Sequence, residues 1–254
     1  MNKELMLQSH SHRPYPLPNL KWIMTQEWHH TLFAHWPVPL SFLKEHVPHE
    51  LEIDTFADSA WIGIVLFQVK NTRGRFTPAI PFLSSYLEVN VRTYVRFRER
   101  TGVYFFSLDA NHLLTVIGAK LTFGLNYKQA NITFSQADDF KMASTRLGTG
   151  ARLKVRYQPI TGVFFAKPGT LEHWLTERYC LWTKRGNQLV RGDIHHAKWE
   201  LQRAQAELEQ EMLIPFANQQ LSTQPPLLHY NQYKKAFFWP PKLELQHLNK
   251  MNEK

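Results

Sequence analysis

The sequence predicts a mainly β protein of the α+β class, an antiparallel barrel or sandwich with a few short helices. Three observations lead to this prediction. The chain has 254 residues, 43% of them hydrophobic and 13% aromatic, which is enough to bury a core and too apolar for a disordered chain. Its apolar segments are mostly short runs or alternating patterns, which favour strands. They do not alternate regularly with helical patterns, as a parallel α/β sheet would require.

Two apolar runs are predicted as central strands. Residues 61–67 read Trp-Ile-Gly-Ile-Val-Leu-Phe, and residues 103–108 read Val-Tyr-Phe-Phe-Ser-Leu. Neither run alternates with polar residues, which is typical of strands covered on both faces. Four further strand candidates are residues 151–157, 179–184, 188–194 and 199–207. The step Arg185-Gly186-Asn187 between two of these segments predicts a hairpin turn.

Residues 86–97 alternate strictly and are predicted as a strand with two different faces. One face carries Glu88, Asn90 and Arg92 between two tyrosines, and the other face is apolar. Successive side chains on one face lie roughly 7 Å apart, so the three polar groups can connect. They either line an interior or form a solvated outer face, because either face of a small barrel can be the interior one.

Three short helices are predicted. The first covers 40–46, after Pro39 and before Pro48. The second begins at Asp109 as N-cap and carries apolar residues at helical spacing as far as Leu121. The third covers 171–178, with Thr170 as its cap.

We expect one domain over residues 1–254, because no segment repeats at a fixed period and no linker divides the chain. Residues 1–20 contain three prolines and are predicted to form an extended N-terminal arm. Residues 245–254 are predicted to be a flexible tail.

Cysteine usage and apolar run length predict a cytoplasmic protein that does not span a membrane. The single cysteine, Cys180, cannot form an intrachain disulfide, and a reducing compartment fits. We expect its thiol to be buried and inert on a strand. The longest apolar run, 60–67, is far shorter than the roughly 20 residues of a spanning helix, and the N-terminus has no signal-type stretch.

The formal charge of +9 favours acidic partners, but the basic residues are scattered. No stretch has the consecutive Lys and Arg residues of a nucleic-acid patch, so nucleic acid is not the expected partner. No cofactor is expected either, because the chain has no phosphate-cradling or dinucleotide loop. No metal is expected, because the adjacent pairs His29-His30 and His195-His196 lack the spacing that places two ligands on one helix face.

Several segments resemble the bacterial YqjF-like family of unknown function. The resemblance covers nearly the whole chain and rests on residues 33–39, 54–56, 60–63, 88–95, 102–109, His196, Trp199, 226–230 and 238–240. That family is placed in the acetoacetate decarboxylase-like superfamily. The resemblance implies a cone-shaped antiparallel β-barrel with an interior ligand cavity.

The sequence departs from the decarboxylase branch at the residue that carries the decarboxylase mechanism, which argues against that mechanism here. The decarboxylase branch forms a Schiff base through a lysine in a Gly-Phe-Pro-Lys-Lys segment just after a helix. In the similar segment here, Gly124 matches the glycine, Tyr127 falls on the nucleophilic lysine and Lys128 falls on the second lysine. A phenol cannot form an imine. Neighbouring strand residues face opposite sides, so Lys128 points away if Tyr127 faces the cavity.

The resemblance also suggests roles for a carboxylate and for another lysine. Glu88 is similar to a carboxylate of the relatives that lies in a Tyr-x-Glu stretch and lines their cavity. Lys120 replaces an arginine common in the relatives, and it either points into the cavity as a cation or substitute amine or faces solvent. Arg92 inside a cavity would favour a carboxylate or phosphate ligand, because a guanidinium is a planar fork of donors.

The sequence therefore predicts a small-molecule-binding barrel for a carboxylate-bearing metabolite, and it leaves catalysis open. The expected catalytic residues are Glu88, Tyr127 and Lys120, through acid–base chemistry or through an imine on Lys120. The expected ligand-binding residues are Trp61, Asn90, Arg92 and Lys128. Two alternatives remain at this point: a non-catalytic protein whose basic surface binds nucleic acid or another anionic partner, and a scaffold with a filled interior. A homo-oligomer is compatible with each of them.

Overall fold

A computed structural model of the chain describes residues 3–79, 84–113, 124–211, 213–214, 216, 221 and 224–244. Its helices are α1 (Lys3–Gln8), α2 (Leu40–Leu43) and α4 (Leu171–Thr176). Its strands are β1 (Met24–Val38), β2 (Glu52–Ile53), β3 (Ala60–Gly74), β4 (Tyr86–Phe97), β5 (Arg100–Ala110), β6 (Tyr127–Gln136), β7 (Phe140–Arg146), β8 (Arg152–Pro159), β9 (Cys180–Arg185), β10 (Gln188–His196), β11 (Gln202–Glu211), β12 (Leu227–Phe238) and β13 (Lys242–Glu244).

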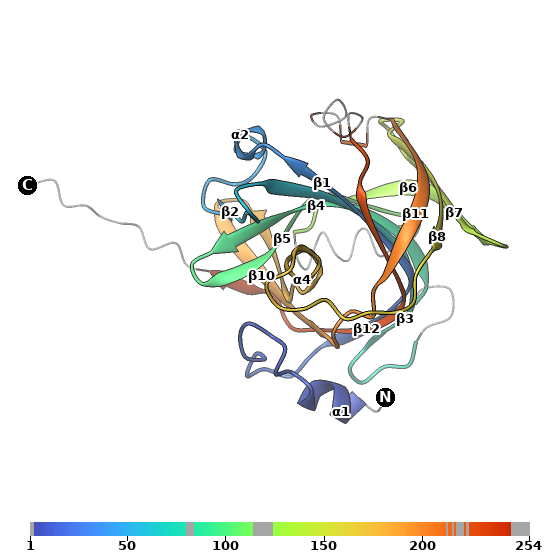
Figure 1. Cartoon of the computed structure of the whole chain (residues 1–254). Helices are drawn as coiled ribbons and strands as arrows, with labels where there is room; N and C mark the ends of the chain where they lie inside the picture. Colours follow the sequence, from blue (N-terminus) through green and yellow to red (C-terminus); the bar gives the residue numbers. More distant parts are fainter. Residues whose placement is uncertain are drawn as a thin grey trace, which may run out of the picture.

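Within the described residues, nine strands close into a barrel. The order is β5-β6-β7-β8-β11-β12-β1-β3-β4, and β4 pairs again with β5. The pairs are antiparallel except for β5 with β6. Figure 1 shows the strands arranged in a ring, and in this view the short helix α4 overlaps the middle of the ring. The predicted mainly β barrel with a few short helices is confirmed.

A second circuit shares part of this barrel. Strand β9 pairs with β5, β9 pairs with β10, and β10 pairs with β12. The strands β12, β1, β3, β4 and β5 therefore form a wall that belongs to both circuits. Because each face of this wall is covered, apolar side chains occur on both sides of its strands.

The alternation of β4 decides which of its side chains face each side of the wall. Val89, Val91 and Val95 belong to one hydrophobic cluster, which also contains Leu153 of β8. The neighbouring residues of opposite parity face a second cluster, which contains Tyr86 and Tyr94. The polar face of β4 is therefore turned toward the interior, because the rings beside it are buried.

Several sequence predictions match these elements. Strand β4 has the predicted bounds, and the runs at 61–67 and 103–108 lie inside β3 and β5. Arg185 pairs with Gln188, so Gly186 and Asn187 form a two-residue hairpin turn. Gly186 has φ of 57°, which such a turn requires. Thr170 caps α4 by accepting a hydrogen bond from the backbone N–H of His173.

Two predictions about local structure are wrong. Asp109 does not cap a helix, because it lies within β5 and is buried against Arg146 of β7. Residues 114–121 of that predicted helix lie outside the described residues, as does the predicted tail at 245–254. The N-terminal arm is not extended throughout, because Lys3–Gln8 form α1. None of these six residues is glycine, proline or β-branched, which favours a helix, and Met6 packs against Phe237.

None of the helices in the described part of the chain is long and apolar enough to cross a membrane.

Candidate functional site

A cavity of about 560 Å³ lies on the polar face of β4. Eight strands supply side chains to its wall: Phe33 (β1), Val65 (β3), Leu108 (β5), Tyr127 (β6), Leu181 (β9), Ile194 (β10) and Phe238 (β12) line it together with the polar residues of β4. Seven of these strands form the second circuit, and β6 adds Tyr127. Cavities of 300–1,000 Å³ with mostly apolar walls and a few placed polar groups are typical of small-molecule sites.

Four of the residues predicted from the sequence meet on one side of this cavity. Glu88, Asn90 and Arg92 are consecutive residues on one face of β4, and all three line it. Tyr127 comes from the first position of β6, where it pairs with Leu108, which in turn pairs with Asn90. Strand β5 therefore brings Tyr127 across to the carboxylate of β4.

The Glu88 carboxyl group receives two hydrogen bonds inside the protein. The Tyr127 hydroxyl donates to Glu88 Oε2 over 2.7 Å. The Asn90 amide Nδ2 donates to Glu88 Oε1 over 3.1 Å. The Tyr86 hydroxyl extends the group, because it interacts with Tyr127 and accepts a hydrogen bond from Gln26 Nε2 over 3.0 Å.

Burial raises the pKa of Glu88 to about 7, and the hydrogen bonds from Tyr127 and Asn90 oppose this only in part. The negative charge of Asp109 nearby raises the pKa further. Burial and the neighbouring Glu88 also raise the pKa of Tyr127, so its hydroxyl keeps its proton at neutral pH. Glu88 can therefore give or take a proton near neutral pH, while Tyr127 acts as a donor.

Arg92 adds positive charge to this polar wall. Its guanidinium lies over the rings of Phe33 and Tyr94, at 5.6 and 5.8 Å from their centroids. Its Nε atom is buried without a hydrogen-bond partner, and the Asn90 Oδ1 atom is likewise unpaired. No carboxylate among the described residues forms an ion pair with Arg92. A bound anion would supply the missing partner, since buried polar groups are rarely left unpaired.

Other residues of the cavity wall were not predicted from the sequence. Arg178 lines the cavity just after α4, and its Nη1 atom donates to Asp54 Oδ2 over 2.6 Å. His196 and the stacked pair Trp28 and Trp199 form another part of the wall. His196 and Trp199 were identified only as part of the family resemblance, because no spacing in the sequence connects them to β4.

Two predicted ligand-binding residues are not part of this wall. Trp61 is buried in the cluster beside Phe33, and its carbonyl oxygen accepts a hydrogen bond from Thr93. Lys128 is exposed, because it follows Tyr127 on the strand and faces the opposite side. Lys120 lies outside the described residues, so its predicted role stays a prediction.

The described residues bring no three His, Cys, Asp or Glu side chains together as ligands for a metal ion. His195 and His196 face opposite sides of β10, as a strand requires. His196 lines the cavity, whereas His195 Nε2 lies 2.9 Å from the carbonyl oxygen of Met6 in the arm.

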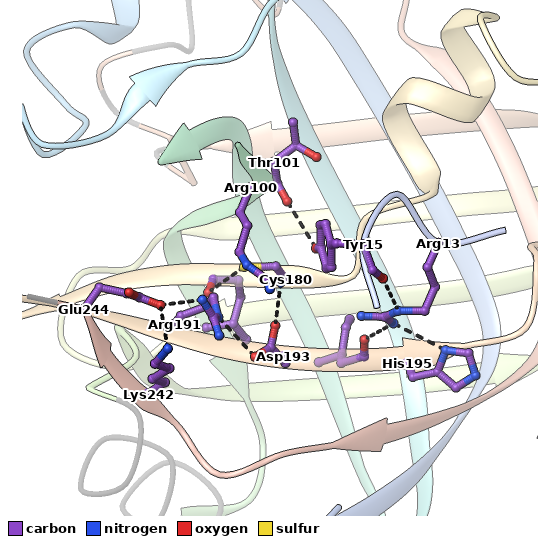
Figure 2. Close-up of polar contacts among 12 residues, drawn as sticks. Arg13, Tyr15, Arg100, Thr101, Cys180, Arg191, Asp193, His195, Lys242 and Glu244 are labelled. Atoms are coloured by element: carbon purple, nitrogen blue, oxygen red, sulfur yellow. Dashed lines mark hydrogen bonds and ion pairs between the residues drawn. The ribbon is translucent and has the colours of Figure 1, made fainter. Parts of the chain in front are cut away.

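A second buried polar cluster lies on β9 and β10, and Figure 2 shows its contacts. Arg191 Nε donates to Asp193 Oδ2 over 3.0 Å, and Arg191 also bonds Glu244. The arm joins this cluster, because Arg13 Nη1 donates to the carbonyl oxygen of Ile194 over 2.7 Å. Cys180 is buried here, and burial raises the pKa of its thiol. None of the ten residues labelled in Figure 2 lines the cavity.

Comparison with known proteins gives a family and a fold. Residues 25–234 match the profile of DUF2071, a family described as an uncharacterized conserved protein. The chain is 40% identical over 226 residues to the uncharacterized protein YqjF of Bacillus subtilis (strain 168), over 88% of this chain and 93% of that protein.

Solved structures with much lower identity share the fold. An acetoacetate decarboxylase from Legionella pneumophila has a TM-score of 0.63 at 13% identity, over 92% of this chain and 94% of the other. The enduracididine biosynthesis enzyme MppR, solved in complex with pyruvate, has a TM-score of 0.61 at 10% identity, over 89% of this chain and 91% of the other. The acetoacetate decarboxylase-like fold is therefore confirmed.

Proposed function

The chain belongs to the DUF2071 family, and we propose that it binds a small carboxylate-bearing molecule in the cavity beside β4 and carries out acid–base chemistry on it. One observation carries this proposal. An arginine without a carboxylate partner and a carboxyl group with a pKa of about 7 lie on the same strand and line the same cavity. Groups with perturbed pKa values in a cavity are the usual constituents of catalytic sites.

The two groups suit different parts of a ligand. The Arg92 guanidinium binds the carboxylate, since its planar donors match two carboxylate oxygens. Glu88 takes a proton from the carbon next to a carbonyl group, so the C–H bond breaks, an O–H bond forms on Glu88, and the electron pair moves to the carbonyl oxygen. The Tyr127 hydroxyl donates a hydrogen bond within this polar group. Return of the proton from Glu88 to the enolate oxygen gives the enol, and its return to the carbon regenerates the keto acid, so neither outcome needs a co-reactant.

An imine mechanism would need an amine at the cavity. In the part of the chain that the structure describes, no lysine lines the cavity wall. Tyr127 stands where the resemblance to the decarboxylases puts the nucleophilic lysine, and a phenol cannot form an imine. Lys120 is the remaining candidate from the sequence. Support for a keto acid as ligand comes from the fold neighbour MppR, which was solved with pyruvate.

Ligand binding tests the proposal directly. Isothermal titration calorimetry with pyruvate, 2-oxohexanoate and phenylpyruvate is expected to show saturable binding of at least one of them, and the corresponding amides should bind more weakly. Arg92→Gln should weaken binding by at least tenfold, because a hydrogen-bonded charge contributes about 1.5–3 kcal/mol. Arg96→Gln is the matched control on the same strand, since Arg96 pairs with Glu52 and does not line the cavity. The proposed carboxylate site would be disproved if none of the three acids binds, or if Arg92→Gln and Arg96→Gln lose affinity equally.

Proton exchange tests the chemical step. In D₂O, the protein is expected to speed the exchange of the protons next to the keto group of a bound oxo acid, followed by ¹H NMR. Glu88→Gln should abolish this exchange and leave binding in place. Exchange that persists in Glu88→Gln would remove Glu88 from the chemistry.

Borohydride reduction separates the imine alternative. Reduction in the presence of acetoacetate or pyruvate, followed by intact mass measurement, is expected to leave the chain unmodified. An adduct that disappears in Lys120→Ala would replace the acid–base mechanism with an imine on Lys120.

A further inference from the structure

The inference that follows rests on the proposed function and concerns the class of ligand. We infer that the cavity accommodates an amphipathic carboxylic acid, with an apolar body of about eight carbons or more, and not only a short keto acid. Three observations carry this: the size of the cavity, the distribution of polar groups over its wall, and its course along β1.

The cavity is much larger than a short keto acid. Its volume of about 560 Å³ lies in the range of cavities that bind drug-sized ligands. Pyruvate has six non-hydrogen atoms and would leave most of this space to water. Buried water needs several polar partners, whereas an apolar wall provides few. A ligand with a hydrocarbon body would remove this apolar surface from water instead.

The unpaired polar atoms of Arg92 and Asn90 lie on β4, while the strands across the cavity contribute apolar side chains. Leu181, Ile194 and Phe238 come from β9, β10 and β12. Four other atoms of lining residues are also unpaired: Thr31 Oγ1, Thr72 Oγ1, Arg178 Nη2 and Trp199 Nε1. Arg178 lies over the same Tyr94 ring as Arg92, so its free nitrogen belongs to the side of the head group. Further polar groups of the lining have partners inside the protein. Gln26 bonds Tyr86, Arg178 bonds Asp54, and His196 is within hydrogen-bond distance of the carbonyl oxygens of Ala197 and Arg178. The β4 side therefore suits a head group, and the facing strands suit a hydrocarbon body.

The residues that line the cavity follow β1 from the neighbourhood of Arg92 toward the protein surface. Phe33 lies under the Arg92 guanidinium at one end. Ile23, just before β1, also lines the cavity and is 40% exposed. Phe33 lies ten positions after Ile23, which corresponds to at most about 33 Å of strand. Beside Ile23, the backbone N–H of Arg75 donates to the Ile23 carbonyl oxygen, and the next residue, Phe76, is 89% exposed. A carboxylate held at Arg92 would therefore direct its apolar body toward an apolar opening.

A series of straight-chain carboxylates tests this inference on the unmodified protein. Calorimetry with butanoate, hexanoate, octanoate and decanoate is expected to show a Kd that falls by about fourfold for each methylene that enters the cavity. Octan-1-ol, which lacks the charge, should bind at least tenfold more weakly than octanoate. If butanoate and decanoate bind equally well, the inference fails and the proposed carboxylate site stands. If no carboxylate or oxo acid binds, the proposed function fails as well.

Substitutions at the two ends of the cavity then locate the ligand. Ile23→Trp should narrow the outer end, so that decanoate loses at least fivefold in affinity and butanoate keeps its own. Leu243→Trp is the matched control, because Leu243 is 53% exposed on β13 and does not line the cavity. Arg92→Gln should weaken every member of the series by a similar factor. An equal effect of Ile23→Trp on short and long carboxylates would contradict the assigned direction.

Discussion

Two of the places where the protein buries charged side chains differ in how far these charges are paired. On β9 and β10, Arg191 bonds both Asp193 and Glu244, and Arg100 lies 3.8 Å from Asp193 (Figure 2). On β4, the Arg92 guanidinium has no carboxylate partner among the described residues, and the Glu88 carboxyl group is bonded only by an amide and a hydroxyl. The first cluster lies outside the cavity wall, whereas the second lines it.

This difference follows from the cost of burying charge. A buried ion is unfavourable unless an opposite charge and further hydrogen bonds compensate it. The β9–β10 cluster meets this requirement largely within the protein, so we assign it to holding the fold and the N-terminal arm. The polar side chains of β4 do not meet this requirement, and their unpaired groups line the cavity. We therefore expect mutations to act on stability in the first region and on ligand binding and protonation in the second.

The largest expected effect is on stability and concerns Asp193. Asp193→Ala leaves the Arg191 guanidinium buried with one of its two carboxylates, and breaking a buried ion pair costs about 3–5 kcal/mol. Urea unfolding should show this loss in the free energy of unfolding. Asp138→Ala, at an exposed position, should change it by less than about 0.5 kcal/mol. A loss below about 1 kcal/mol for Asp193→Ala would remove the distinction between the two regions.

The next effect depends on pH and concerns Glu88. Its pKa is about 7 in the folded protein against an ordinary value of 4.5. The folded state therefore keeps a proton that the unfolded state has released, and stability is present below about pH 4.5 and is lost as the pH rises through 7. The loss should reach about 3 kcal/mol above pH 8.

In Glu88→Gln, the side chain at position 88 does not titrate, so this contribution to the pH dependence of stability is absent. Unfolding curves between pH 5 and 9 should show the unmodified protein becoming less stable relative to Glu88→Gln as the pH rises. Glu45→Gln, at an exposed position, should leave the pH profile unchanged. A constant difference between the unmodified protein and Glu88→Gln across this range would show that Glu88 is not buried in a raised-pKa state.

A smaller effect is expected at Tyr127. Its hydroxyl bonds the Glu88 carboxyl group and lowers the pKa of Glu88. Tyr127→Phe removes a hydrogen bond to a charged group, of about 1.5–3 kcal/mol, and should raise that pKa by about one to two units. ¹³C NMR of labelled glutamate would follow the titration. Tyr157→Phe is the control, because Tyr157 bonds the carbonyl oxygen of His30 away from the cavity.

The smallest effect is expected in the arm. The Tyr15 hydroxyl donates to the carbonyl oxygen of Thr101 over 3.3 Å, and its ring lies beneath Arg13 and Arg100. Tyr15→Phe keeps the ring and removes one hydrogen bond, so the loss of stability should be about 0.5–1.5 kcal/mol. Carboxylate affinity should not change. A clear loss of ligand binding in Tyr15→Phe would show that the two regions are coupled.

Local patterns predicted some strands of the shared wall, β3, β4 and β5, and missed others, β1 and β12. Strand β4 alternates strictly and was predicted at its observed bounds. Strand β1 was not predicted, because register shifts between Thr25 and Glu27 and between His29 and Leu32 interrupt its alternation. Strand β12 was not predicted either, since it places the charged Lys234 in a buried position. A period of two is visible only where a strand is regular and its faces differ.

The site divides in the same way between sequence and tertiary structure. The alternation of β4 by itself determined that Glu88, Asn90 and Arg92 share a face, because side chains of a strand repeat every two residues. The resemblance to known relatives drew attention to Tyr127. Only the closed sheet decided that this face is buried and that the pKa of the Glu88 carboxyl group rises to about 7. It also decided that Arg178 lines the cavity and bonds Asp54, which lies 124 residues away in the sequence. Burial and long-range pairing depend on which strands meet in space, and a local pattern does not contain that information.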